Sequence, residues 1–106
     1  MVRSQKKNSK DSSDREAARE RFAYNLAVAM DLREMNAESL ADAVGVIPDT
    51  IYKYRAAKRE PEVYMLSRLA QALRLDVNEL YPGSDALAAR RSASRKRSSA
   101  MKNKLN

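Results

Sequence analysis

Four polar residues in the segment 48–55 are spaced so that they would share the outward side of a helix. They are Asp49, Thr50, Tyr52 and Lys53. Ile51 and Tyr54 would then face inward, because residues three apart lie on one side of a helix. A lysine ammonium can donate to guanine O6 and N7, and a carboxylate can accept from the amino groups of cytosine and adenine. The row therefore suits contact with base edges in the major groove of DNA; a solvated polar face is the alternative.

The residues in front of this row predict a short helix followed by a tight turn. Asn36 is a good N-cap, since its side-chain oxygen can accept from a free amide of the first turn. An apolar stripe of helical period follows, and Gly45 supplies a left-handed residue that ends the helix. The stripe consists of Leu40, Ala41 and Val44. A second helix opens at Pro48, whose fixed φ suits a first helical position. The sequence therefore predicts helices over about 37–44 and 48–55.

Three further helices are predicted around this pair. The first runs over about 14–34, and its cap is Ser13 or Asp14. The fourth follows Pro61, and the fifth is a short helix at about 77–81. The residues expected to face the core are, in the first helix, Ala18, Phe22, Leu26, Ala29 and Met30. In the fourth helix they are Val63, Leu66, Leu69, Ala70 and Leu73. The predicted fold class is therefore all-α, a compact five-helix domain.

The composition limits the possible chemistry. With 106 residues, the chain fits one small domain. It contains no cysteine and no histidine, which excludes disulfides, thiolate metal sites, cysteine nucleophiles and histidine-based acid–base catalysis. We therefore expect no metal, no cofactor and no enzymatic activity. No apolar run approaches the roughly 20 residues that cross a bilayer, and no hydrophobic signal segment follows the N-terminus. We therefore expect a cytoplasmic protein without a membrane partner.

The net charge of +7 is concentrated at the C-terminus. Residues 1–14 form a polar arm that we expect to be flexible; they carry +2, whereas the domain at 15–84 carries −1. The tail at 85–106 carries +6 and has little apolar surface. We expect it to be disordered or partly helical, with a short helix at about 86–91. Such a tail could add phosphate contacts of low sequence preference, or it could serve only solubility.

Several segments together resemble the XRE family of helix-turn-helix regulators, which includes the lambda-type repressors and Cro proteins. The resemblance spans about Phe22 to Tyr81. It rests on the segment NAESLADAVGV, the pair Thr50-Ile51, the loop Lys58-Arg59-Glu60-Pro61 and the closing segment LSRLAQALRLDVNELY. The resemblance implies a five-helix, lambda-repressor-like domain that binds double-stranded DNA. It also implies binding to operators as a homodimer, with the second and third helices as the reading pair.

The resemblance implies roles for individual residues as well. The positions that face base edges in the family correspond to Pro48, Asp49, Tyr52 and Lys53. The positions that hold the sugar-phosphate backbone correspond to Asn36, Thr50, Lys58 and Arg59. The expected dimer contacts are Val77, Leu80 and Tyr81. These three could instead only close the core, and Asp49 could only stabilise the start of its helix.

Three features depart from the family pattern. Ile47 stands where the family usually has a capping serine or threonine, so the helix that follows loses its cap. Arg55 and Met30 stand where the family often has a glutamate and an arginine that pair, so both partners have changed. Arg55 could extend the basic surface towards DNA or lie along core methylenes. Ala57 replaces a frequent glycine, so we expect the helix to continue further.

The sequence therefore indicates a sequence-specific transcriptional regulator, a repressor that occupies an operator with two half-sites, as in phages or mobile elements. One alternative is the antitoxin of a toxin–antitoxin pair, which would repress its own operon and wrap a toxin with the basic tail. Another is a module that binds a regulatory protein and no longer reads DNA. The small body leaves no room for a ligand-binding domain, so control would come from concentration, DNA affinity or a partner protein.

Overall fold

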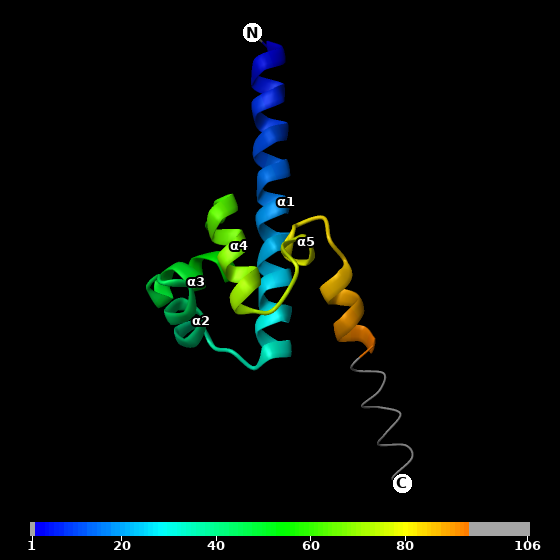
Figure 1. Ribbon diagram of the computed structural model, residues 1–106. Coiled ribbons are helices and arrows are strands. Elements are labelled where there is room, and N and C mark those ends of the chain that lie inside the picture. The colour runs from blue at the N-terminus through cyan, green and yellow to red at the C-terminus, as the bar shows by residue number, and fades with distance from the viewer. Residues whose placement is uncertain (1, 94–106) are drawn as a thin grey trace.

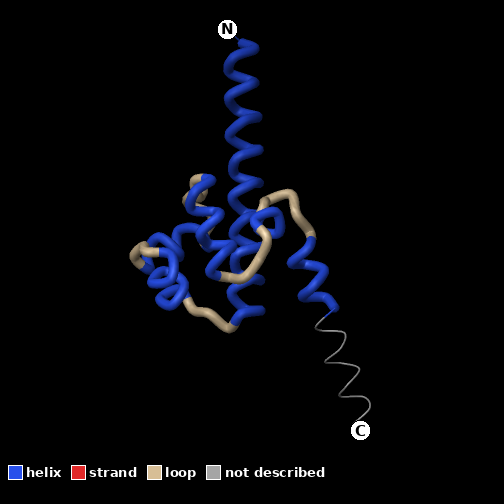
Figure 2. The backbone as a smooth tube through the Cα atoms, in the orientation of Figure 1, coloured by secondary structure: helices blue, strands red, loops and turns tan. Residues whose placement is uncertain are grey.

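The computed structural model of the protein describes residues 2–93, with side chains described from residue 13 onward. Its helices are α1 (Val2–Arg33), α2 (Ala37–Val44), α3 (Pro48–Arg55), α4 (Val63–Ala72) and α5 (Val77–Leu80). A further helix at residues 86–93, which we call the C-terminal helix, follows α5. In Figure 1, α2 and α3 lie to the left of α1 and the C-terminal helix lies to its right. No strand occurs among residues 2–93, so the fold is all-α as predicted (Figure 2).

Helix α1 is longer than the sequence pattern predicts. It begins at Val2, so the predicted start near residue 14 is wrong, and Ser13 and Asp14 lie inside the helix instead of capping it. The segment before residue 14 contains neither proline nor glycine. A helix that is already formed can extend through such a segment without a new nucleation step. The N-terminal half of α1 stands clear of the other helices (Figure 1), and only the second half builds the domain.

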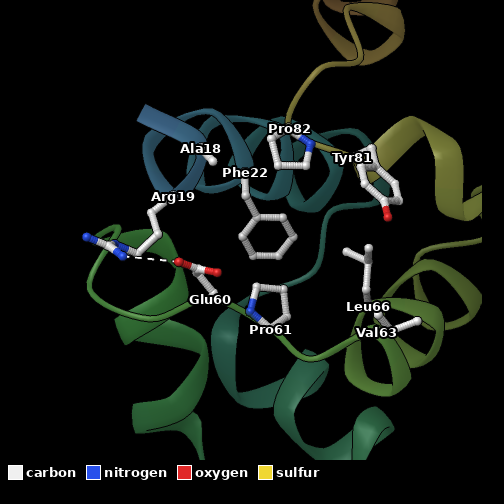
Figure 3. A pocket seen from close by; sticks show the side chains of 9 residues that line it. All are labelled: Ala18, Arg19, Phe22, Glu60, Pro61, Val63, Leu66, Tyr81 and Pro82. Carbon is white, nitrogen blue, oxygen red and sulfur yellow. Dashed lines mark hydrogen bonds and ion pairs between the residues drawn. The ribbon is translucent and has the colours of Figure 1, made fainter. Parts of the chain in front are cut away.

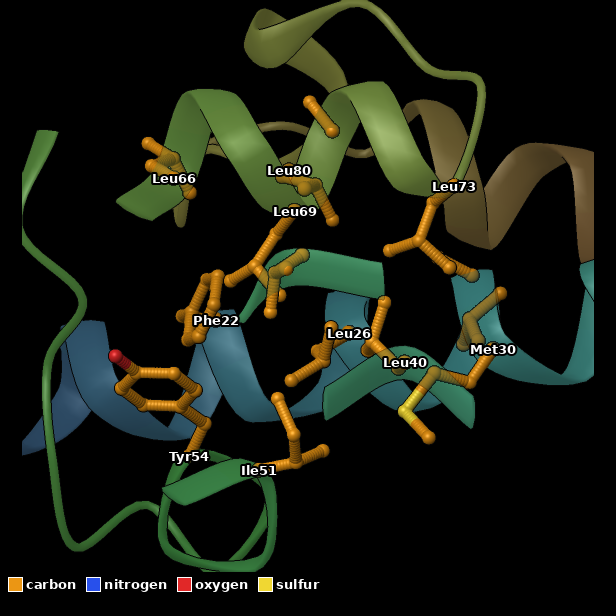
Figure 4. Packing of buried hydrophobic residues seen from close by; sticks show 14 of the residues in the cluster. Phe22, Leu26, Met30, Leu40, Ile51, Tyr54, Leu66, Leu69, Leu73 and Leu80 are labelled. Carbon is orange, nitrogen blue, oxygen red and sulfur yellow. The ribbon is translucent and has the colours of Figure 1, made fainter. Parts of the chain in front are cut away.

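The core forms around that second half of α1 (Figure 4). Its large side chains include Phe22, Leu26, Met30, Leu40, Ile51, Tyr54, Leu66, Leu69, Leu73 and Leu80. The rings of Phe22 and Tyr54 meet edge to face, with centroids 5.9 Å apart. The inward positions predicted for the helices are confirmed, except at two residues. Ala18 is only half-buried. Val63, the first residue of α4, is 77% exposed.

Helices α1 to α4 all end in the same way. Each is followed by a left-handed residue, and the next amide donates to the carbonyl five residues earlier. The left-handed residues are Glu34 (φ 54°), Gly45 (φ 80°), Ala57 (φ 60°) and Arg74 (φ 56°). This arrangement satisfies carbonyls that the helix itself leaves free. Only one of the four is glycine, although a left-handed conformation costs other residues about 1–2 kcal/mol.

The turn after α3 therefore differs from the prediction. Helix α3 ends at Arg55 as the predicted range 48–55 has it, but the turn after it is not helical for longer, because Ala57 adopts a left-handed conformation with φ 60°. The Lys58 amide donates to the Lys53 carbonyl over 2.9 Å, which closes the helix around the left-handed Ala57. Alanine thus adopts a left-handed backbone conformation that glycine would favour.

The C-terminal helix is part of the folded body. Leu87 is fully buried and belongs to the core cluster, so the predicted boundary at residue 84 does not match the packing. Arg90 Nη2 lies 2.7 Å from Glu79 Oε2 of α5. The predicted short helix at 86–91 is confirmed and continues to residue 93. The rest of the predicted basic tail, residues 94–106, lies outside the described residues.

A buried amide fixes the loop that leads into the C-terminal helix. Asn25 of α1 is 3% exposed. Its Nδ2 donates to the carbonyl of Tyr81 over 2.9 Å and to that of Ser84 over 3.4 Å. Because a buried polar group is stable only when it is hydrogen-bonded, Asn25 ties the chain after α5 to the central helix.

Candidate nucleic-acid interface

The pair α2 and α3 forms as the local sequence predicts. Asn36 is the N-cap of α2, and its Oδ1 accepts from the Ser39 amide over 2.8 Å. Gly45 ends α2 in the left-handed conformation, and α3 begins at Pro48. Ile47 makes no side-chain cap to α3, so the loss of that cap is confirmed. The Thr50 amide instead donates to the Ile47 carbonyl over 3.0 Å.

Helix α3 is anchored on one side and open to solvent on the other. Ile51 and Tyr54 are 0% and 3% exposed, respectively, and they fix the rotation of the helix about its axis. Arg55 lies on the exposed side of α3. Its side chain therefore does not lie along the core, where the family pattern has an ion pair. Met30 fills its own position in the core.

Two of the predicted base-reading residues form an ion pair with each other. Lys53 Nζ lies 3.2 Å from Asp49 Oδ2, one helical turn away, and both side chains are exposed. Pro48 is half-buried at the start of the same helix. Exposed pairs at this spacing contribute only about 0.3–0.5 kcal/mol, so either partner can exchange it for a better contact.

The fourth base-reading residue, Tyr52, is held by a residue that the sequence pattern did not identify. The Tyr52 hydroxyl donates to Glu38 Oε1 of α2 over 2.9 Å. This hydrogen bond to the carboxylate, together with its charge, raises the pKa of Tyr52 above its ordinary value. Glu38 lies in the first turn of α2, where an acid is expected for the helix dipole alone. No sequence signal distinguishes that role from contact with α3.

The residues predicted to hold the DNA backbone differ in their exposure and in the contacts that they make. Lys58 is exposed, whereas Thr50 is only half-buried. The Arg59 guanidinium lies 6.0 Å from the centre of the Tyr54 ring, within range of a cation–π contact. The side-chain oxygen of Asn36 is occupied by the cap of α2, which leaves its amide nitrogen for another contact.

The predicted dimer contacts do not all lie on the surface. Leu80 is fully buried, so the prediction that it contacts a partner is wrong, and the alternative that it closes the core is confirmed. Val77 is half-buried and Tyr81 is 52% exposed. Tyr81 lies at the edge of an apolar hollow of about 160 Å³ between α1, the start of α4 and the loop after α5 (Figure 3). The Arg19–Glu60 ion pair, 3.1 Å long, closes another edge of this hollow.

Two kinds of site are not found in the part of the chain that the structure describes. Residues 13–93 contain no group of three side chains suited to hold a metal ion. None of the helices in the described range is long and apolar enough to cross a lipid bilayer.

Comparison with known proteins gives one family and several similar structures. The model of a helix-turn-helix family matches residues 26–80, whereas no curated protein is significantly similar to the chain. The restriction-modification controller protein C.AhdI from Aeromonas hydrophila is 22% identical, with a TM-score of 0.61 over 64% of this chain and 99% of that one. The clp gene regulator ClgR from Corynebacterium glutamicum is 19% identical, with a TM-score of 0.59 over 83% and 89% of the two chains. These likenesses show the fold.

A third similar structure belongs to an enzyme, hydroxypropylphosphonic acid epoxidase from S. wedmorenis. It is 25% identical, with a TM-score of 0.60 over 63% of this chain but only 36% of the enzyme. The likeness therefore concerns one part of that protein. The family match covers more than half of the present chain and includes the whole of α2, α3 and α4. The chain therefore belongs to the XRE family of helix-turn-helix DNA-binding regulators.

Proposed function

We propose that the protein is a sequence-specific transcriptional repressor that binds an operator of two half-sites through α3. The observation that carries this proposal is the position of α3, with Ile51 and Tyr54 in the core and Asp49, Tyr52 and Lys53 exposed. A helix held in this way can enter the major groove with its polar side towards the bases.

In this proposal Lys53 donates to guanine, and Asp49 accepts from an amino group of cytosine or adenine. Their mutual ion pair is worth about 0.3–0.5 kcal/mol, whereas a good base contact contributes about 1–3 kcal/mol of discrimination. Exchange of the ion pair for base contacts is therefore favourable. Pro48 would lie beside them at the point where α3 enters the groove.

Phosphate contacts would come from the end of α3 and the turn that follows it. Three basic residues lie between positions 55 and 59 without an intervening acid. They are Arg55, Lys58 and Arg59. Asn36 and Thr50 would add contacts near the starts of α2 and α3. Because phosphate contacts carry no sequence information, they would set the register of α3 along the groove.

We also propose that two copies of the chain bind together, with Tyr81 and Val77 at their contact. An operator with two half-sites requires this symmetry. Tyr81 offers exposed aromatic surface beside the apolar hollow, and aromatic residues are enriched in protein interfaces.

A second candidate function is a protein-interaction module that keeps the fold without reading DNA. It is favoured by the acidic groups on the same surface, since Asp49 and Glu38 occupy Lys53 and Tyr52 in the free protein. The antitoxin of a toxin–antitoxin pair is a separate alternative, which would bind its own operator as well as a toxin. The tail that would wrap a toxin includes residues beyond the described range.

Selection of bound duplexes from a random DNA pool tests the proposal, with the full chain at near-physiological salt. We expect an enriched inverted repeat, because weak phosphate binding fades at this salt concentration while base reading persists. Lys53→Ala should flatten one position in each half-site. Lys58→Ala should weaken binding to all sequences and reduce the salt slope by about one. A folded chain that enriches no sequence would refute the repressor and favour the interaction module.

A further inference from the structure

The contact between Tyr52 and Glu38 determines which hydrogen bonds the tyrosine can still make. Tyr52 lies on the exposed side of α3, with 49% of its surface accessible to solvent. Its hydroxyl donates to Glu38 Oε1 across the gap between α3 and α2, over 2.9 Å. A phenol has a single O–H donor. Once this donor is used by Glu38, the Tyr52 oxygen can only accept.

The carboxylate has the same property. The oxygens of a glutamate carboxylate accept hydrogen bonds and donate none. The Tyr52–Glu38 pair therefore presents only acceptors, from two adjacent side chains that belong to different helices of the reading pair. Its negative charge also disfavours a phosphate beside it. This argues against a phosphate contact by Tyr52.

The base edges of the major groove differ in the groups that they offer to such a pair. Adenine presents the N6 amino group and cytosine presents the N4 amino group, and both donate. Guanine O6 and N7 and thymine O4 only accept, so they would meet the acceptors of the pair without a shared proton. From this arrangement we infer that Tyr52 and Glu38 act as one unit that reads an amino-bearing base, adenine or cytosine. The inference rests on the proposed function and names the bases for one position of the operator.

Glu38 is the positioning residue in this unit. A hydrogen bond to an ionised acceptor is about twice as strong as one between neutral groups. The Tyr52 hydroxyl therefore continues to donate its hydrogen bond to Glu38 when a base approaches. The raised pKa of Tyr52 has the same cause. Without Glu38, the hydroxyl could rotate and donate to guanine or thymine.

The test compares base preferences at every operator position for the wild type and four variants of the full chain. The variants are Tyr52→Phe, Glu38→Ala, Glu38→Gln and, as a control, Tyr64→Phe. Tyr64 is also an exposed tyrosine with a hydrogen-bonded hydroxyl, but it contacts Arg68 within α4, outside the reading pair. The thermal midpoint of each variant shows whether it is folded.

Because every base pair contains one amino-bearing base, the strand that is read is identified by removing that amino group, with purine in place of adenine or 2-pyrimidinone in place of cytosine. We expect one base pair in each half-site at which this removal weakens wild-type binding. Tyr52→Phe should reduce the base preference at that position about 3- to 10-fold, the effect of one hydrogen bond, and leave the other positions unchanged. Glu38→Ala should shift the same position towards guanine or thymine. Glu38→Gln should retain only part of the original preference, since its amide oxygen can still accept from the hydroxyl but its amino group adds a donor. Tyr64→Phe should change no position.

Two results would overturn the inference while leaving the repressor intact. One is an enriched operator whose profile is unchanged in Tyr52→Phe. The other is a Tyr52-dependent position at which removal of the base amino group leaves wild-type binding unchanged, or that Glu38→Ala leaves as it was. A wild type that enriches no operator would instead contradict the proposed function, and the inference would fail with it.

Discussion

Replacement of Leu87 by alanine tests whether the C-terminal helix belongs to the cooperative fold. Leu87 is fully buried in the core cluster. The substitution removes three buried carbon atoms, which at about 0.8 kcal/mol per methylene amounts to roughly 2.4 kcal/mol of transfer free energy. The cavity left behind adds to this loss, because the surroundings relax only in part. We therefore expect the free energy of unfolding to fall by about 3–4 kcal/mol.

Urea unfolding followed by circular dichroism at 222 nm measures this change. A small domain has a total stability of about 5–15 kcal/mol, so the midpoint should move by a large fraction while the slope stays the same. Leu32→Ala is the matched control, since Leu32 is a leucine of α1 that is 36% exposed. It should change the stability by about 0.5 kcal/mol or less.

The refuting result is a Leu87→Ala chain that unfolds at the same urea concentration as Leu32→Ala. The segment after residue 84 would then contribute no packing, and the domain would end where the sequence pattern places its boundary. Loss of stability together with a smaller slope would also count against the argument, because it would show that the C-terminal helix unfolds separately from the rest.

Three other perturbations have expected outcomes. Ala57→Gly should stabilise the chain by about 0.5–1 kcal/mol, since relief of the left-handed strain exceeds the added entropy of the unfolded chain. Ala43→Gly, at an ordinary helical position, should destabilise the chain by a similar amount in the same urea titration. Equal effects of the two substitutions would contradict the φ of 60° at Ala57. Asn25→Ala should lower the free energy of unfolding by about 1–3 kcal/mol, because it leaves the Tyr81 carbonyl without its donor. The control is Asn78→Ala, at an exposed asparagine. A loss of stability no larger than that of the control would count against the contact. Tyr52 should titrate above its ordinary pKa of 10.0 when absorbance at 295 nm is compared with that of Tyr52→Phe, and Glu38→Gln should lower the pKa again. Because the pKa of Tyr52 is raised in the folded state, the stabilisation by this hydrogen bond is complete below the unfolded pKa and is lost as the pH rises through the folded pKa. A Tyr52 that titrates alike with and without Glu38 would disprove that Glu38 raises its pKa.

The helix pair at the centre of the interface could be predicted because its signals are local. Asn36, Gly45 and Pro48 each act on the backbone within one helical turn. The inward residues Ile51 and Tyr54 follow from the helical period alone. These features need no knowledge of what lies across from them, so pattern and capping chemistry are sufficient.

The residues that pattern misassigned are those whose environment depends on distant segments. The period of α4 places Val63 on the apolar side, but the core ends before it reaches that residue. Leu80 was predicted to contact a partner at the surface, yet α5 places its side chain fully inside the core. The start of α1 also escaped prediction, because a polar segment without proline or glycine is compatible with helix and with coil.

Within the candidate interface, the sequence alone determined the two helices, their turn, the row of polar residues on α3 and the family to which the fold is similar. Only the tertiary structure decided how these residues pair, since the contact of Tyr52 with Glu38 joins positions 14 residues apart on two helices. It also decided that Leu87 belongs to the core. The physical reason is that capping and periodicity are properties of a single segment. Burial and hydrogen-bond partners depend instead on the space that the other helices leave.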